Sequence, residues 1–304
     1  MLPFFAFILI IWCLPAIGNV NVPSYCIGVD FGTESVRVGI WDTHKVDQFY
    51  PVVSKAVPYK TYFPQPGFAE QNPTDWWDCF GQAMKQCIDE GKIDVQHVKG
   101  LAIDCTACSV CALDENFVPL CNSLLWMDQR SSQQTKFILD KAKGNEFLKV
   151  NSNGNGPISA EWMIPKSLWL KQNEPFIWKK CKVICEKQDF LNFKLTGLLT
   201  TSGCNVAARW NWNAISACKR RYYKDDSYEG RPLSLLKLID LEDIVEKWPD
   251  QCVAMGEKIG CLTKDAAEFL GLTSDVEVIQ VLTHSLLLTH SLTHSLTPKT
   301  TGRS

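Results

Sequence analysis

A short polar gap separates two apolar runs near the start of the chain, in the segment GVDFGTESVRVGIWD. The residues in and just after this gap that could do chemistry are Asp30, Gly32, Thr33, Ser35 and Arg37. Turn amides, two hydroxyls and a guanidinium are donors that suit phosphate oxygens, and Asp30 can hold a hydrated magnesium ion. Phosphoryl transfer needs such groups, because negative charge spreads over the transferred group in its transition state. An ordinary hairpin with a polar turn would carry the same residues, so the segment alone leaves both interpretations open.

The apolar runs that flank the gap, YCIGVD and VRVGIWD, predict two short strands. The intervening FGTES is too short for anything but a hairpin turn, and Gly32 can adopt the unusual dihedral angles that a turn requires. The sequence therefore predicts that the candidate phosphate-binding groups lie at the tip of a hairpin.

A helix is predicted to follow, because Asn72 suits an N-cap, Pro73 the first helical position and Asp75 the first turn. Further helices are predicted for EWMIPKSLWLKQN, KQDFLNFKLTG, LEDIVEKWPD and TKDAAEFLG, and further strands for VKGLAID, CSVCALD and CKVICE. Gly197 and Gly271 suit helix ends, and Thr263 suits a cap. This order predicts an α/β domain with a mixed sheet and helices on its faces.

The overall composition favours a small-molecule ligand. The 304 residues are 46% hydrophobic with a net charge of −2, which suits one large or two small globular domains. No long basic run is present, which argues against a nucleic-acid partner.

The 14 cysteines show no spacing of a disulfide framework, and we interpret them as mostly reduced and buried. Cys105, Cys108 and Cys111 in DCTACSVCAL have a spacing that suits zinc or an iron–sulfur cluster. In an extended chain, residues three apart point to opposite faces, so we favour core packing for these thiols.

The two ends of the chain differ from its middle. Residues 2–17 form an apolar run that is either a signal peptide or a leader from a spurious upstream start. Near the other end LTHSL occurs three times, which we interpret as low-complexity sequence rather than as a histidine metal site. The predicted organisation is a leader at 1–23, a folded domain at 24–281 and a tail without a fold at 282–304.

Six segments, in order, resemble the N-terminal half of FGGY carbohydrate kinases, and the ribulokinase branch above all. They are GVDFGTESVRVGIWD, EQNPTDWWDC, LAIDCTACSVCALD, LLWMDQRS, ISAEWMIPKSLWLKQN and TTSGCNVAARWNW. The resemblance covers roughly Tyr25 to Glu277. It implies an actin-like, ribonuclease-H-like domain paired with a second domain of the same fold, ATP and magnesium between the two, and a sugar bound mainly against the first.

The resemblance also implies roles for single residues. Asp30, Gly32, Thr33 and Ser35 match the phosphate and magnesium turn. The matches to the sugar pocket and its surroundings are Ala107, Asp128, Arg130, Glu161 and Arg209. The Asp128–Arg130 pair could bind polyol hydroxyls, brace the loop, or be a surface ion pair.

Two matched positions depart from the ribulokinase branch. The first is Ala160, which stands where a proline is usual. Arg209 stands where a lysine is usual, which leaves the substrate preference open, and a solvated surface residue is the alternative. We interpret the tryptophans at 76, 77, 126, 162, 169, 210 and 212 as core residues rather than as a platform for sugar stacking.

The resemblance ends at GLTSDVEVIQV, before the glycine-rich stretch in which the family carries its general-base aspartate and before the second domain. We therefore expect no catalytic base in this chain and no sugar turnover by the chain alone.

The expected function is that of an ATP-dependent carbohydrate kinase acting on a pentulose such as ribulose, or on a related sugar or polyol, in the cytoplasm. One alternative is a non-catalytic sugar-binding or interaction module, forming a homo-oligomer or associating with a full-length relative. The other is a secreted or membrane-tethered protein directed by residues 2–17.

Overall fold

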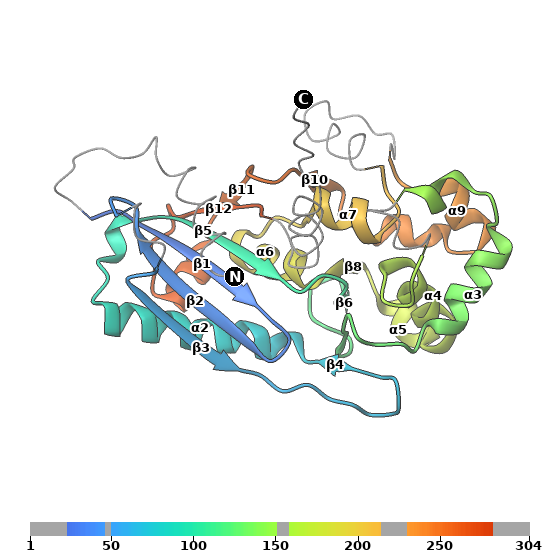
Figure 1. Ribbon diagram of the computed structural model, residues 1–304, viewed down its shortest axis with the longest axis horizontal. Helices are drawn as coiled ribbons and strands as arrows, with labels where there is room; N and C mark the ends of the chain where they lie inside the picture. Colours follow the sequence, from blue (N-terminus) through green and yellow to red (C-terminus); the bar gives the residue numbers. More distant parts are fainter. Residues whose placement is uncertain (1–22, 46–49, 151–157, 214–229, 282–304) are drawn as a thin grey trace, which may run out of the picture.

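The computed structural model of the chain describes residues 23–45, 50–150, 158–213 and 230–281. These residues form an elongated molecule with a twisted sheet at one end and a group of helices at the other (Figure 1). The apolar leader and the LTHSL repeats lie outside the described residues.

The larger sheet has six strands in the order β11-β12-β5-β1-β2-β3. Their bounds are β1 Tyr25–Phe31, β2 Ser35–Asp42, β3 Val53–Pro58, β5 Val98–Cys105, β11 Lys258–Cys261 and β12 Glu277–Ile279. The sheet is mixed, because β1 pairs antiparallel with β2 but parallel with β5. The predicted hairpin is confirmed, and its register places Asp30 directly opposite Arg37.

Three helices pack together against this sheet: α2 Pro73–Gly91, α6 Lys187–Thr196 and α10 Lys264–Leu270. The predicted caps are confirmed. The Asn72 side chain accepts a hydrogen bond from the amide of Thr74, and that of Thr263 accepts one from Ala266. Gly197 and Gly271 end α6 and α10 in the left-handed conformation, which glycine adopts without steric penalty.

A second sheet lies in the middle of the molecule, and most of the remaining helices form the end opposite the first sheet (Figure 1). The sheet has the order β4-β7-β6-β8, with bounds β4 Glu70–Gln71, β6 Val110–Leu113, β7 Ser123–Leu124 and β8 Val183–Glu186. A short parallel pair joins β9 Thr200–Ser202 to β10 Gln251–Val253. The helices are α3 Ser132–Lys141, α4 Met163–Asn173, α5 Pro175–Lys180, α7 Gly203–Arg209 and α9 Leu233–Leu238, with 3-10 turns at Val95–His97, Glu146–Lys149 and Glu242–Glu246.

One predicted helix is wrong. LEDIVEKWPD contains only the 3-10 turn Glu242–Glu246. Pro249 disfavours the helical conformation at Trp248, which leaves only the residues 241–247, about two helical turns. Ile244, Val245 and Trp248 nevertheless pack into the core, so the apolar spacing that suggested a helix reflects burial on a short turn.

Two other predicted elements begin later than expected. The strand of CSVCALD begins at Val110, because Cys108 has φ 67° in a turn. The helix of EWMIPKSLWLKQN begins at Met163, which leaves Glu161 in the preceding loop. Among the described residues, no helix combines the length and apolarity needed to cross a bilayer.

Candidate functional site

The turn between β1 and β2, residues 31–35, has every carbonyl oxygen engaged within the protein. Phe31 O accepts from Thr106 N at 3.1 Å, and Glu34 O from Tyr59 N at 3.1 Å. The Tyr59 hydroxyl donates to Gly32 O at 2.6 Å, and Gln71 Nε2 donates to Thr33 O at 2.6 Å. Ser35 O accepts from Gly32 N at 3.1 Å. The turn is therefore held from its carbonyl side by neighbouring elements.

The orientation of these carbonyls directs the next amides outward. In a trans peptide the C=O and the following N–H point in opposite directions. Because Gly32 O and Thr33 O face the protein, the N–H groups of Thr33 and Glu34 face away from it. Neither amide has a hydrogen-bond partner within the described parts of the chain. Successive outward amides form a concavity that suits an anion.

The other groups at the turn fit phosphate and magnesium as well. A Cβ on Gly32 would come within 3.3 Å of Arg37 Nη1 and 3.5 Å of Ser35 O, so a side chain there would crowd the turn. Arg37 Nη1 donates to Asp30 Oδ2 at 3.2 Å, and the side chain of Arg37 is 46% exposed. A carboxylate, a half-exposed guanidinium and outward amides together form a donor set for a phosphate–magnesium ligand. The parallel register also places Asp104 of β5 beside Asp30.

A second turn, residues 106–109, lies next to the first, and Ala107 is buried within it. Buried charges fix this turn from two sides. Glu186 Oε2 accepts from Cys108 N at 2.9 Å, and Lys166 Nζ donates to Cys108 O at 2.6 Å. Burial raises the pKa of Glu186 and lowers that of Lys166 to about 8.

Glu161 and Arg209 both lie near this second turn. Burial raises the pKa of the Cys108 thiol to about 12; Glu161 acts in the same direction and Arg209 in the opposite one. The Arg209 guanidinium lies 5.3 Å from the ring centroid of Trp162, and Nη1 donates to Ala208 O at 3.3 Å. Its Nε is buried and has no hydrogen-bond partner in the described parts of the chain. The structure thus places Glu161 and Arg209 near the turn that contains Ala107.

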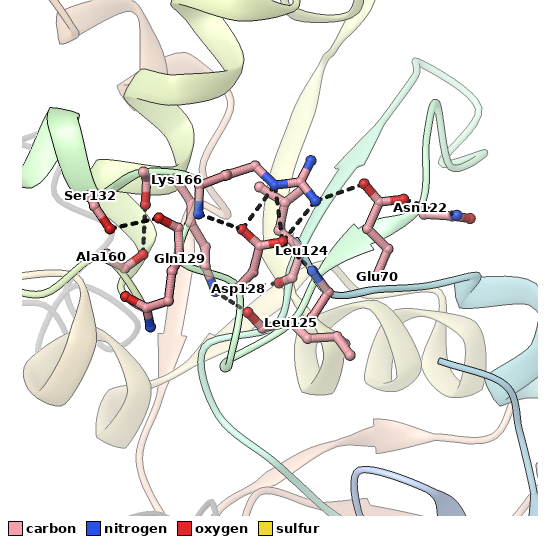
Figure 2. A network of polar contacts seen from close by, with 12 residues as sticks. Glu70, Asn122, Leu124, Leu125, Asp128, Gln129, Ser132, Ala160 and Lys166 are labelled. Carbon is pink, nitrogen blue, oxygen red and sulfur yellow. Dashed lines mark hydrogen bonds and ion pairs between the residues drawn. The ribbon is translucent and has the colours of Figure 1, made fainter. Parts of the chain in front are cut away.

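Asp128 and Arg130 form a buried ion pair rather than a surface one. Arg130 Nε lies 2.9 and 3.0 Å from the two Asp128 oxygens, and Nη2 donates to Asp128 Oδ2 at 2.7 Å. Arg130 Nη2 also donates to Glu70 Oε1 at 2.7 Å, and the guanidinium lies 3.8 Å from the Phe68 ring centroid. Figure 2 shows Asp128 at the centre of these contacts, close to Leu124 and Leu125, whose carbonyl oxygens lie near Lys166 Nζ. Both carboxylate oxygens are engaged within the chain, which suits a brace.

Lys166 connects the pair to the second turn. Its Nζ donates to Leu125 O at 2.5 Å as well as to Cys108 O, and lies 3.5 Å from Leu124 O (Figure 2). The Asp128 side chain in turn accepts from Ala69 N at 2.7 Å. The segment 124–130 is therefore fixed relative to the turn at 106–109.

Trp126 departs from its interpretation as a core residue. Its side chain is among the exposed large ones, at 39%, and its Nε1 donates to Thr33 Oγ1 at 3.2 Å. An exposed indole beside the first turn offers a flat apolar face. By contrast, the predicted burial is confirmed for the tryptophans at 76, 77, 162, 210 and 212.

Cys105, Cys108 and Cys111 are all buried, on β5, in the turn and on β6 respectively. Cys111 Sγ lies 2.9 Å from Ser123 Oγ. Within the described ranges, no group of three or more histidine, cysteine or acidic residues is placed to hold a metal.

Several residues at the site were not identified from the sequence. Tyr59, Gln71 and Lys187 all contact the first turn, from 24 to 155 positions away in the chain. Glu186 likewise reaches the second turn across 78 positions. A pattern of neighbouring residues in the sequence does not indicate contacts between positions so far apart in the chain. Gln71 lies in the segment EQNPTDWWDC, which resembles the family, but no role was assigned to it from the sequence; Tyr59 and Lys187 lie outside all six segments, so only the fold identifies them.

Comparison with known proteins agrees with this geometry. A profile of the "FGGY family of carbohydrate kinases, N-terminal domain" matches residues 25–286. The FGGY carbohydrate kinase domain-containing protein of Xenopus laevis is 33% identical over 270 residues, which are 84% of this chain and 44% of that protein. A ribulokinase of Staphylococcus epidermidis is 25% identical over 272 residues, which are 84% of this chain and 48% of the enzyme.

The fold is shared with solved sugar kinases. The ligand-bound xylulose kinase from Lactobacillus acidophilus superposes with a TM-score of 0.71 at 20% identity, covering 89% of this chain and 50% of that one. The domain described here therefore has the actin-like ATPase fold, which confirms the predicted fold class. The chain belongs to the FGGY family of carbohydrate kinases and contains the family's N-terminal domain. It spans about half the length of the curated relatives it matches.

Proposed function

We propose that this chain supplies the phosphate-binding turn and the sugar-binding surface of an ATP-dependent pentulose kinase. One observation carries the proposal: the two turns and the segment 124–130 are joined to one another. Thr106 N donates to Phe31 O at 3.1 Å, and Trp126 Nε1 donates to Thr33 Oγ1 at 3.2 Å. A phosphate on the first turn would thus lie next to a sugar held at the second.

At the first turn, the amides of Thr33 and Glu34 and the Arg37 guanidinium would donate to phosphate oxygens. Asp30 would hold a hydrated magnesium ion, which neutralises charge on the phosphates when it is bound. The side-chain hydroxyls of Thr33 and Ser35 complete the donor set. Since the carbonyls of the turn are already bonded, the donors need no rearrangement when the anion arrives.

At the second turn, Ala107, Glu161 and Arg209 would contact the sugar, and the exposed face of Trp126 would cover it. The Glu161 carboxylate can accept hydrogen bonds from sugar hydroxyls, and Arg209 can donate to sugar oxygens. We assign the Asp128–Arg130 pair the role of bracing this surface, because both Asp128 oxygens and the Nε and Nη2 atoms of Arg130 are engaged within the chain. Ribulose is the proposed pentulose, on the resemblance to ribulokinases.

Isothermal titration calorimetry of the purified 304-residue chain with ribulose, xylulose, gluconate and glycerol tests the assignment. We expect saturable binding of ribulose, weakened about tenfold or more in Arg209→Met. Lys194→Met is the matched control, because Lys194 is an exposed lysine outside the site. Binding of another sugar, without binding of ribulose, would contradict the pentulose assignment.

A coupled assay with magnesium and ATP on the same preparation tests whether these 304 residues alone phosphorylate the sugar. We expect no phosphorylation of the sugar by these 304 residues alone. Turnover would place the catalytic base within them and contradict the expectation drawn from the family resemblance.

A further inference from the structure

Lys187, the first residue of α6, is fully buried behind the first turn. Its backbone N donates to Ser109 O at 2.9 Å, which fixes the start of the helix beside the second turn. Its Nζ lies 3.4 Å from Gly32 O, the carbonyl to which the Tyr59 hydroxyl also donates. The ammonium group therefore sits on the protein side of the turn, opposite the outward amides.

The surroundings of this ammonium are mainly aromatic. Nζ lies 4.4 Å from the ring centroid of Trp76 and 5.3 Å from that of Tyr59. No carboxylate lies within ion-pair distance of Lys187 in the described ranges. The ionisable groups that act on it from neighbouring strands are Cys105, Cys111 and, with the smallest effect, Asp30, whose Oδ2 accepts a hydrogen bond from Arg37 Nη1.

A buried ammonium without a carboxylate destabilises a fold unless other groups compensate it. Burial lowers the pKa of Lys166 to about 8, as it does that of Lys187, and the two lysines differ in their partners: Lys166 Nζ has two carbonyl oxygens at 2.5 and 2.6 Å. Lys187 Nζ has one carbonyl oxygen, that of Gly32, at 3.4 Å, and lies over the rings of Tyr59 and Trp76. Burial lowers the pKa of Lys187 to about 8, so the group is mostly charged at neutral pH. A lysine held at a stability cost beside a binding turn is typical of a functional group.

We propose that Lys187 is a positioning residue for the polyphosphate: it holds Gly32 O toward the protein, directs the Thr33 amide outward, and places a positive charge behind the bound anion. The inference rests on the proposed function of the turn. Lys187 does not touch the phosphate, since the side chain has no exposed surface. Its contribution is electrostatic and acts through the peptide between Gly32 and Thr33.

The test uses the whole chain and magnesium tripolyphosphate, which presents phosphates without a nucleoside. Lys187→Met keeps the length and apolar volume of the side chain and removes the charge. Lys187→Arg keeps the charge. Lys194→Met is the matched control, because Lys194 is an exposed lysine on the same helix, 5.1 Å from the Trp77 ring. Affinities come from calorimetry, and melting temperatures from the same samples.

We expect Lys187→Met to melt at a higher temperature than the wild type and to bind tripolyphosphate about tenfold more weakly, with unchanged ribulose affinity. Lys194→Met should match the wild type in both ligands, and Lys187→Arg should regain part of the lost affinity. A lower melting temperature together with equal losses for both ligands would indicate a merely structural residue and overturn the inference.

The two proposals fail in different ways. Wild-type binding of tripolyphosphate that Lys187→Met leaves unchanged would overturn only the role of Lys187. No binding of tripolyphosphate by the wild type would contradict the proposed phosphate turn, and this inference with it.

Discussion

The first turn and the Asp128 network contain the same three residue types in very different states. Each has an aspartate, an arginine and a buried lysine: Asp30, Arg37 and Lys187 at the turn, and Asp128, Arg130 and Lys166 in the network. In the network the arginine is 5% exposed, and the aspartate is fully buried and contacted by it at 2.7 Å. At the turn the arginine is 46% exposed and makes one contact at 3.2 Å.

This difference separates a brace from a binding surface. In the network, each charge has several partners within the chain, so little capacity remains for a ligand. At the turn, the carbonyls are bonded but the arginine is half exposed and two amides face outward. Residue type alone does not distinguish the two cases; the number and geometry of partners does.

The largest expected effect is on the braced pair. Asp128→Ala leaves the buried Arg130 without its bidentate partner, and we expect a loss of about 3–5 kcal/mol in the free energy of unfolding. Urea denaturation measures it. Glu277→Ala is the control, since its pair with Lys258 is more than a third exposed and should contribute less than about 1 kcal/mol. Equal losses in the two variants would remove the distinction between braced and exposed pairs.

The lysine of the network should also stabilise the fold. Lys166→Met removes the donor to Cys108 O and Leu125 O. We expect a loss of about 1–3 kcal/mol, because Cys108 O is left without a donor while Leu125 O keeps only its bond from Asp128 N. The same denaturation experiment checks it. A variant as stable as the wild type would show that Lys166 is not part of the brace.

Lys187, the lysine of the turn, should destabilise the fold, unlike Lys166. At pH 7 we expect Lys187→Met to be more stable than the wild type by about 1–3 kcal/mol. The pKa of Lys187 is about 8 in the folded chain against 10.5 for an ordinary lysine. Below pH 8 both states carry the proton, and the full penalty of the buried charge is present.

Between pH 8 and 10.5 the folded state releases this proton first, so the unfolded state binds more protons and wild-type stability rises with pH relative to the variant. The advantage of Lys187→Met should therefore shrink across this window. Paired denaturation curves at pH 7 and at pH 10 measure the difference, and a constant advantage would contradict the account.

The smallest expected effect is on the arginine of the turn. Arg37→Met should change the free energy of unfolding by less than about 1 kcal/mol, since the Arg37 side chain is 46% exposed and makes one contact with Asp30, at 3.2 Å. Denaturation at low and high salt checks it. A loss comparable to that of Asp128→Ala would mean that the Asp30–Arg37 pair is structural.

Much of the fold near the turn was predictable from the sequence because its signals are local. The strand–turn–strand segment and the caps at Asn72, Thr263, Gly197 and Gly271 each depend on a few neighbouring residues. The segment LEDIVEKWPD was not predictable in this way, because burial of its apolar residues imitates helical spacing.

The candidate site was predictable only where a motif carried it. The hairpin supplied Asp30 to Arg37, and the resemblance supplied Ala107, Asp128, Arg130, Glu161 and Arg209. Trp126 was misjudged, since a tryptophan in an apolar segment is usually buried. Lys187 and Tyr59 reach the turn only through tertiary packing, and nothing in their local sequence indicates it.

Hydrogen exchange of the wild-type chain, read by mass spectrometry with and without magnesium ATP, tests the central claim most directly. If the outward amides of Thr33 and Glu34 bind phosphate, exchange in a peptide covering residues 31–36 slows when the nucleotide is added. Exchange in residues 124–132 stays as it was. Unchanged exchange at residues 31–36 at saturating nucleotide would contradict the account of the turn as the phosphate site.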